Sequence, residues 1–237
     1  MNYPIKHVSA SSIKCYNTCP YAFKMKYINK IKQPSNEHFA FGTGVHATTE
    51  LFMTIKNRTG KYPPLLAIMK HYQKTMADEA QKLTKKQKDA LRNMYEIGHD
   101  LSEKLYYKMI EWDTTDEQLM FWADLGWPKK AFGFFDVPVP GGIKELKTTS
   151  SGWSKADRDN SIQFTIYNEA YYKIHGIWPK MDLVELNKKT LEIKETPIRR
   201  NADSRVKLDM LVNNMFDGMK NNEYPRCEKR NCWACSL

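Results

Sequence analysis

The stretch Gly133-Phe134-Phe135-Asp136, followed nine residues later by Glu145-Leu146-Lys147, decides how the centre of this chain folds. Residues 131–137 and 143–148 are predicted to be strands, with Pro140-Gly141-Gly142 as the turn between them. Since strand side chains alternate between faces, Glu145 and Lys147 point the same way and can meet Asp136 across a short hairpin. Such a group of acids and a lysine suits a hard cation and a water molecule.

Length and composition predict one globular domain over residues 1–237. Of the 237 residues, 41% are hydrophobic and 12% aromatic, which leaves little room for disorder. The first residues lack an apolar signal core, and no apolar run approaches the length of a membrane span. We therefore expect a cytoplasmic protein that does not enter a membrane.

The charge balance favours a polyanionic partner. Lys and Arg number 37 against 27 Asp and Glu, a net charge of +10. No acid precedes Glu37, and lysines in that segment alternate with aromatic residues, as in proteins that hold a phosphate backbone and stack bases. The candidate DNA-binding residues there are Lys14, Lys24, Lys26 and Tyr27. The alternative is a helix with aromatics packed inward and lysines simply in solvent.

The coarse pattern divides the chain into four parts. A basic helical segment over 1–35 precedes a helical insert over 44–112, a core over 117–200, and a last helix with a cysteine-rich tail over 201–237. Strands are expected at 119–123, 131–137 and 143–148, forming an antiparallel meander, and at 181–186 and 190–195. Helices are expected at 159–174 and 202–221. The predicted fold is α/β of the α+β kind, a mixed sheet flanked by helices.

All five cysteines lie near the two ends of the chain: Cys15, Cys19, Cys227, Cys232 and Cys235. In a reducing compartment this distribution favours a metal or cluster that ties the ends together over disulfides. The spacing Cys227-x4-Cys232-x2-Cys235 suits one zinc ion or one iron–sulfur cluster. The alternative is a set of free thiols.

Taken in order, five motifs resemble the RecB-like branch of the PD-(D/E)XK nuclease superfamily. They are Gly42-x3-His46, Gly133-x2-Asp136, Glu145-x-Lys147, Gln163-x3-Tyr167, and an early Cys19-Pro20 with a cysteine-rich tail. The last resembles the iron–sulfur members, including CRISPR-associated exonucleases and the nuclease domains of recombination helicases. The resemblance covers almost the whole chain and implies a restriction-endonuclease-like sheet, with the helical insert between the histidine and the catalytic strands.

The resemblance also implies roles for single residues. Metal ligands would be His46, Asp136, Glu145 and the backbone carbonyl of Leu146, and the catalytic residues would be Asp136, Glu145, Lys147, Gln163 and Tyr167. In this hypothesis Lys147 orients a water and stabilises charge on the attacked phosphate. Each has a structural alternative, such as an ion pair for Glu145, a surface lysine for Lys147 or core packing for Tyr167.

For the cysteines, the resemblance implies that Cys19 joins Cys227, Cys232 and Cys235 around a 4Fe-4S cluster, with zinc as the alternative. The family's tail usually has a CxxC followed by a last cysteine, whereas here Cys227 precedes the CxxC. Cys15 is either a substitute ligand or a small buried residue.

The function implied is a Mg²⁺- or Mn²⁺-dependent deoxyribonuclease, an exonuclease acting in DNA recombination, repair or replication. DNA ends, single- or double-stranded, would be its substrate, and a helicase, recombinase or integrase is a possible partner. The alternative is a non-catalytic DNA-binding or assembly module that keeps the fold and uses a structural cysteine site.

Overall fold

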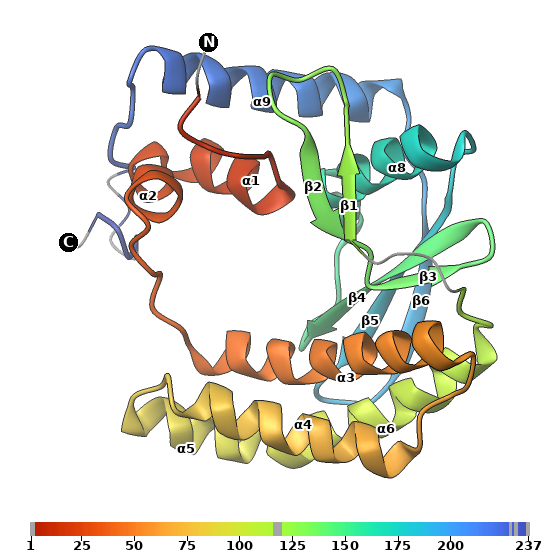
Figure 1. Cartoon of the computed structure of the whole chain (residues 1–237). Helices are drawn as coiled ribbons and strands as arrows, with labels where there is room; N and C mark the ends of the chain where they lie inside the picture. Colours follow the sequence, from red (N-terminus) through yellow and green to blue (C-terminus); the bar gives the residue numbers. More distant parts are fainter. Residues whose placement is uncertain (1–2, 116–119, 228, 230–231, 236–237) are drawn as a thin grey trace.

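A mixed sheet of four strands carries the acids and the lysine of the central motif. In the computed structural model, which describes residues 3–115, 120–227, 229 and 232–235, its order is β3-β4-β5-β6. The strands are β3 (Val137–Val139), β4 (Gly142–Thr149), β5 (Lys180–Asn187) and β6 (Ile193–Ile198). β4 and β5 are parallel and the other pairs are antiparallel, so the predicted mixed sheet is confirmed (Figure 1).

A separate two-stranded ribbon lies beside this sheet. It pairs β1 (Met120–Ala123) with β2 (Ala131–Phe134), and Val8 adds a parallel bridge to Ala131. The prediction that the first three strands form one antiparallel meander is therefore wrong. The chain leaves the ribbon at Phe135 and Asp136 and enters the four-stranded sheet only at β3. Of the first predicted strand, Leu119 lies outside the described residues.

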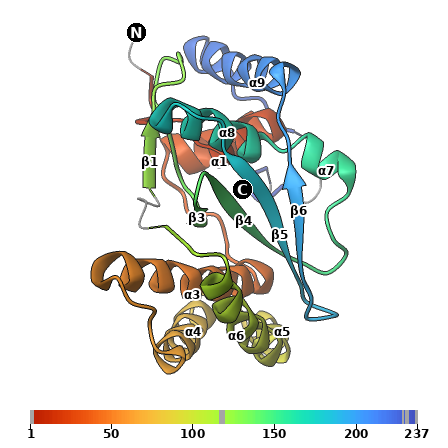
Figure 2. The same ribbon diagram turned by 90° about the vertical axis from the view of Figure 1, so that its right-hand side faces the viewer.

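Alternation along the sheet strands divides the apolar residues between two cores. Ile143, Met181 and Leu183 face a core shared with α1 (Ala10–Thr18), α8 (Ile162–His175) and α9 (Ala202–Lys220). Val137, Leu146 and Val184 face a second core formed with the helical insert. Figure 2 shows the sheet between these helical layers, so β4 is covered on both faces.

The helical insert begins earlier than predicted. It consists of α3 (Glu37–Thr59), α4 (Leu65–Ala80), α5 (Lys85–Asn93) and α6 (Tyr95–Glu111). The Asn36 side chain accepts hydrogen bonds from the backbone N–H groups of His38 and Phe39, which starts α3 there rather than at Gly44. His46 accordingly lies within the helix and not at its beginning.

The predicted helix over 159–174 corresponds to α8 (Ile162–His175), and a separate short helix, α7 (Lys155–Asp159), precedes it. The Ser154 and Asp157 side chains form a reciprocal cap that starts α7, and α8 begins after Ser161. Both belong to the crossover between the parallel strands β4 and β5. The buried face of α8 packs in the same core as Ile143 and Leu183 of the sheet.

The C-terminal cysteines lie beside the segment that carries Cys19 and α2 (Pro20–Phe23) (Figure 1). Cys19 follows α1 and its Sγ accepts a hydrogen bond from the backbone N–H of Ala22, capping α2. A π-helical turn, Lys24–Ile28, follows α2, and the Tyr16 hydroxyl donates to the carbonyl oxygen of Glu223 at 3.0 Å, just beyond α9. Among the described residues, no helix is both long and apolar enough to cross a membrane.

Close packing in the insert depends on Gly98 in α6. A Cβ atom there would overlap the hydroxyl of the buried Tyr72, which donates a hydrogen bond to the Tyr95 carbonyl at 2.8 Å. It would also lie 3.0 Å from Phe41 Cε2. Glycine at this position therefore lets α3, α4 and α6 approach one another.

We predict that Gly98→Ala destabilises the protein, although alanine normally favours a helix. Overpacking should cost about 1–3 kcal/mol in the free energy of unfolding, measured by urea denaturation. In a Tyr72→Phe background the worst overlap is absent, so the same substitution should cost less. An equal cost in both backgrounds would contradict the role assigned to the hydroxyl.

Candidate active site

Asp136 lies at the point where the chain passes from the ribbon to the sheet. Its Oδ2 accepts a hydrogen bond of 2.8 Å from the backbone N–H of Leu146 on β4. If the pairing of β3 with β4 continued in register, Leu146 would lie opposite Phe135. The Asp136 side chain thus takes the Leu146 N–H in place of a partner on the neighbouring backbone. This explains why the predicted strand over 131–137 is interrupted, with Asp136 between strands and not at the end of one.

Glu145 and Lys147 share one face of β4, as the sequence predicted. The Lys147 Nζ forms an ion pair with Glu145 Oε1, and the Glu145 side chain is almost completely buried. Leu146 between them points to the other core. The face carrying Glu145 and Lys147 is the one that α8 covers.

α8 supplies Gln163 and Tyr167, four residues apart on one helical face. The Gln163 Nε2 donates to Glu145 Oε1 at 2.7 Å and lies 2.9 Å from the Tyr167 hydroxyl. Gln163 therefore links the buried acid to the helix. Gly133 on β2 permits this packing, since a Cβ there would lie 3.3 Å from Tyr167 and 2.7 Å from Phe121.

His46 reaches the same group from the opposite helical layer. Its Nδ1 lies 3.5 Å from Asp136 Oδ1. Burial disfavours charge on the ring, but the adjacent Asp136 carboxylate outweighs that effect and raises the pKa of His46. The structure thus brings His46, Asp136, Glu145, Lys147, Gln163 and Tyr167 into one site, linked by contacts between neighbouring members.

The surroundings of the two acids shift their pKa values in opposite directions. Burial first, and then the nearby Asp136, raise the pKa of Glu145 to about 8. Burial also acts on Asp136, but His46 and Lys147 outweigh it and lower the pKa of that carboxyl. Burial therefore favours the neutral form of Glu145, whereas Lys147 favours its ionised form.

These residues fit a hard divalent cation. Glu145 Oε2 is buried and accepts no hydrogen bond within the described part of the chain. Leaving such an oxygen without a partner is costly, and a cation that prefers oxygen ligands would satisfy it. His46 Nδ1 and Asp136 Oδ1, which lie 3.5 Å from each other, are further donor atoms of the same group.

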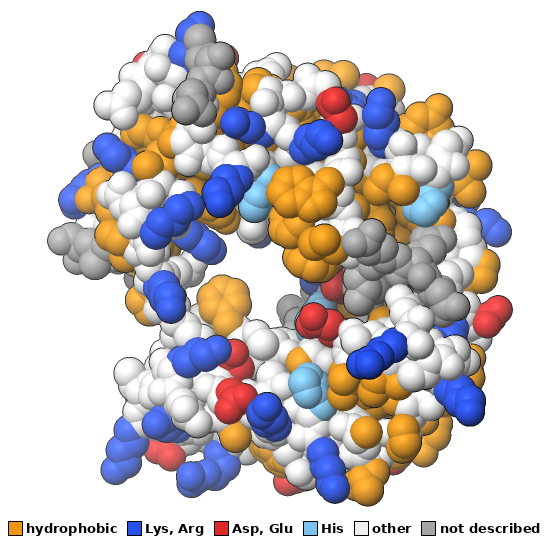
Figure 3. All heavy atoms as spheres, viewed as in Figure 1, with side chains coloured by type: hydrophobic (Ala, Val, Ile, Leu, Met, Phe, Trp, Pro, Cys, Tyr) orange, Lys and Arg blue, Asp and Glu red, His pale blue; other side chains and the backbone are white. Residues whose placement is uncertain are grey.

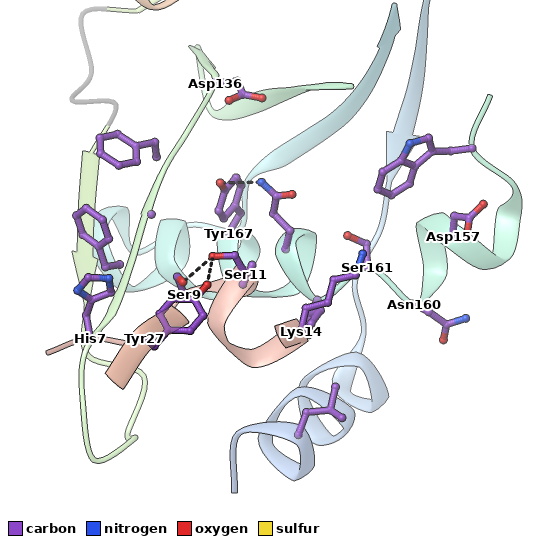
Figure 4. A pocket seen from close by; sticks show the side chains of 18 of the residues that line it. His7, Ser9, Ser11, Lys14, Tyr27, Asp136, Asp157, Asn160, Ser161 and Tyr167 are labelled. Carbon is purple, nitrogen blue, oxygen red and sulfur yellow. Dashed lines mark hydrogen bonds between the residues drawn. The ribbon is translucent and has the colours of Figure 1, made fainter. Parts of the chain in front are cut away.

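A cavity of about 1220 Å³ opens beside this group, and Asp136, Gln163 and Tyr167 form part of its lining (Figure 4). Of the candidate DNA-binding residues, Lys14, Lys26 and Tyr27 line it from the N-terminal segment. Lys24 does not, because its Nζ lies over the ring of Tyr224 at 5.1 Å. Figure 3 shows an opening in this face, with Lys and Arg side chains mainly along its left side and hydrophobic and acidic side chains on the right.

Sequence reasoning missed several residues around the site. Glu185 on β5 is buried opposite Lys147 and accepts a hydrogen bond of 2.5 Å from the backbone N–H of Trp153, which lines the cavity. An acid within the apolar run Leu183–Leu186 was a usable signal. Phe132 and Phe134 also line the cavity, and their alternation before Asp136 was visible in the sequence.

Four cysteines come together at the chain ends. The Sγ atoms of Cys19, Cys227, Cys232 and Cys235 all lie within 4.8 Å of one another. The Sγ–Sγ distance is 3.5 Å for Cys19–Cys235, 3.6 Å for Cys19–Cys232 and 3.9 Å for Cys227–Cys235. Burial would raise the pKa of Cys232, but hydrogen bonds from its cysteine neighbours lower it to about 7. Cys15 is not part of this group.

Comparison with known proteins agrees with this architecture. The model of the PD-(D/E)XK nuclease superfamily matches residues 7–237. A crystal structure from Eubacterium rectale, described as a "putative exonuclease", superposes with a TM-score of 0.69 at 17% sequence identity, covering 98% of this chain and 88% of that one. No curated protein matches the chain. The predicted fold class is confirmed.

The raised pKa of Glu145 predicts a pH effect on stability. Since folding raises that pKa from 4.5 to about 8, the folded metal-free protein keeps a proton that the unfolded chain releases. The stabilisation that Glu145 gives the folded protein is fully present below pH 4.5 and is lost as the pH rises to 8. Glu145→Gln should therefore gain thermal stability relative to wild type between pH 5 and 9 in EDTA, measured by melting temperature.

If the difference in melting temperature between wild type and Glu145→Gln did not change with pH, the raised pKa of Glu145 would be contradicted. Mn²⁺ should raise the melting temperature of wild type at pH 8 more than that of Glu145→Gln, because the cation would bind the ionised carboxylate.

Proposed function

Because this chain belongs to the PD-(D/E)XK nuclease superfamily, we propose that it is a Mg²⁺- or Mn²⁺-dependent exonuclease that shortens DNA from its ends. The observation that carries the proposal is the buried Glu145, paired with Lys147 and beside Asp136, with one carboxylate oxygen left for a cation. The fold shared with the "putative exonuclease" supports the choice of exonuclease over endonuclease.

The metal ligands in this proposal are Asp136, Glu145, His46 and the backbone carbonyl of Leu146. A bound Mg²⁺ or Mn²⁺ supplies charge neutralisation at the attacked phosphate and makes a water more acidic. The Leu146 N–H holds Asp136 in place at 2.8 Å. Gln163 does the same for Glu145 at 2.7 Å, so both acids are oriented before substrate arrives.

Lys147 is the residue that acts on the reacting groups. Its ammonium is held by Glu145, and less than a quarter of its side chain is exposed. From there it can orient the attacking water and stabilise the negative charge that develops on the phosphate. Neighbouring acids raise the pKa of Lys147 despite its burial, so it stays charged at neutral pH.

The test of the overall proposal uses linear and covalently closed circular DNA of one sequence. With Mg²⁺ or Mn²⁺, linear DNA should be degraded and circles should remain intact, while EDTA should stop the reaction. Cleavage of circles would show an endonuclease. No metal-dependent cleavage of either substrate would favour the non-catalytic binding module.

Lys147→Ala should lower the rate of DNA cleavage on the order of a hundredfold or more, because one stabilising charge is lost from the transition state. Binding of DNA should change little, and the melting temperature should fall because the buried Glu145 carboxylate loses its ion-pair partner. Lys194→Ala is the matched control, since Lys194 is an exposed lysine on β6 of the same sheet. Normal cleavage by Lys147→Ala in either metal would refute the role given to this residue.

For the cysteine group we propose a single tetrahedral zinc ion. A metal–sulfur distance of about 2.3 Å gives a tetrahedron whose edges are about 3.8 Å, close to the separations of 3.5, 3.6 and 3.9 Å found for three of the Sγ pairs. In an iron–sulfur cluster each thiolate binds a different iron, which requires a wider group. The ion would join Cys19, beside α2, to the C-terminal residues.

Cys235→Ser should lose the bound metal and lower the melting temperature, because the link between the two chain ends is removed. Cys15→Ser is the matched control and should keep the bound metal and the melting temperature of the wild type. Metal analysis of the purified protein should find one zinc and no iron. A brown anaerobic preparation with iron and inorganic sulfide would instead show the iron–sulfur cluster.

A further inference from the structure

One face of the ribbon formed by β1 and β2 is apolar and exposed. Phe121, Ala123 and Ala131 point into the core. On the opposite face, register places Met120 beside Phe134 and Trp122 beside Phe132. Trp122 is 49% exposed and Phe134 is 50% exposed. Strand alternation alone would put polar residues on a solvent-facing side, so the rings there need another explanation.

His7 completes an array of rings on this face. The parallel bridge between Val8 and Ala131 carries His7 to the ribbon, where its ring centroid lies 4.6 Å from that of Phe132. The Phe132 ring is also 4.6 Å from Trp122 and 5.2 Å from Phe134. Burial and then Lys30 and Lys6 lower the pKa of His7, which favours a neutral ring. We call His7, Trp122, Phe132 and Phe134 the aromatic array.

The aromatic array leads directly to the candidate active site. Phe134 precedes Asp136 by two residues, and His7, Phe132 and Phe134 line the same cavity as Asp136 and Gln163 (Figure 4). Lys14 and Lys26 line that cavity from the N-terminal segment. The other acid of the lining, Asp157, accepts hydrogen bonds from Ser154 as a helix cap.

From this continuity we propose that the aromatic array stacks the bases of single-stranded DNA while Lys14 and Lys26 hold its phosphates. The inference rests on the proposed nuclease function and names the form of DNA that the site prefers. Exposed rings stack on any base whose face is free, whereas the bases of a duplex are already stacked on one another. The flanking lysines match the phosphate charges that accompany those bases.

The binding test compares two single-stranded oligonucleotides of equal length, one of thymidine residues and one abasic, which carry the same phosphates. In a Lys147→Ala background with Mn²⁺, the thymidine strand should bind on the order of tenfold more tightly, measured by fluorescence anisotropy. Phe134→Ala and Trp122→Ala should each reduce this preference. Equal affinity for both strands, or no effect of either substitution, would overturn the proposal.

Trp178→Ala is the matched control, since Trp178 is 57% exposed and is not part of the aromatic array. It should leave the preference for the thymidine strand unchanged. Melting temperatures of all variants should remain near that of the parent, because the substituted rings are half exposed. Loss of preference in Trp178→Ala as well would show that the effect is not specific to the array.

Cleavage of single-stranded and duplex oligonucleotides of one sequence tests the nuclease function and the preference for single strands separately. Faster metal-dependent cleavage of the single strand by wild type, lost in Phe134→Ala, supports the proposal. Faster cleavage of the duplex overturns the inference while the nuclease function stands. Cleavage of neither substrate overturns the nuclease function itself.

Discussion

The burial of the Glu145 carboxylate on β4 is the constraint on which the site depends. Removing a charged group from water is costly, and the structure compensates one oxygen with Lys147 and Gln163. Those partners come from the same strand and from the crossover helix α8. The second oxygen has no hydrogen-bond partner within the described chain, which makes the acid group suited to a cation.

Because β4 is covered on both faces, the two helical layers meet at the site. α8 contributes Gln163 and Tyr167 from one side, and α3 contributes His46 from the other. The N-terminal segment then forms a wall of the cavity through Lys14 and Tyr27. That segment also holds Cys19, one of the four residues of the cysteine group.

Much of this arrangement could be predicted from strand alternation and helical periodicity. Glu145 and Lys147 share a face, and the sheet is mixed, as expected. The interruption at Asp136 could not be predicted, because it depends on a hydrogen bond from Leu146, ten residues away. The position of Lys24 over Tyr224 was equally hidden, since it depends on packing between the two chain ends.

The sequence by itself determined which residue types occur, their alternation in strands and the clustering of cysteines at the ends. These are local properties, set by side-chain chemistry and by the period of each element. Tertiary structure decided that His46 meets Asp136 from another layer and that His7 joins the rings of the ribbon. The physical reason is that such contacts join residues far apart in the chain, which only the packing of layers brings together.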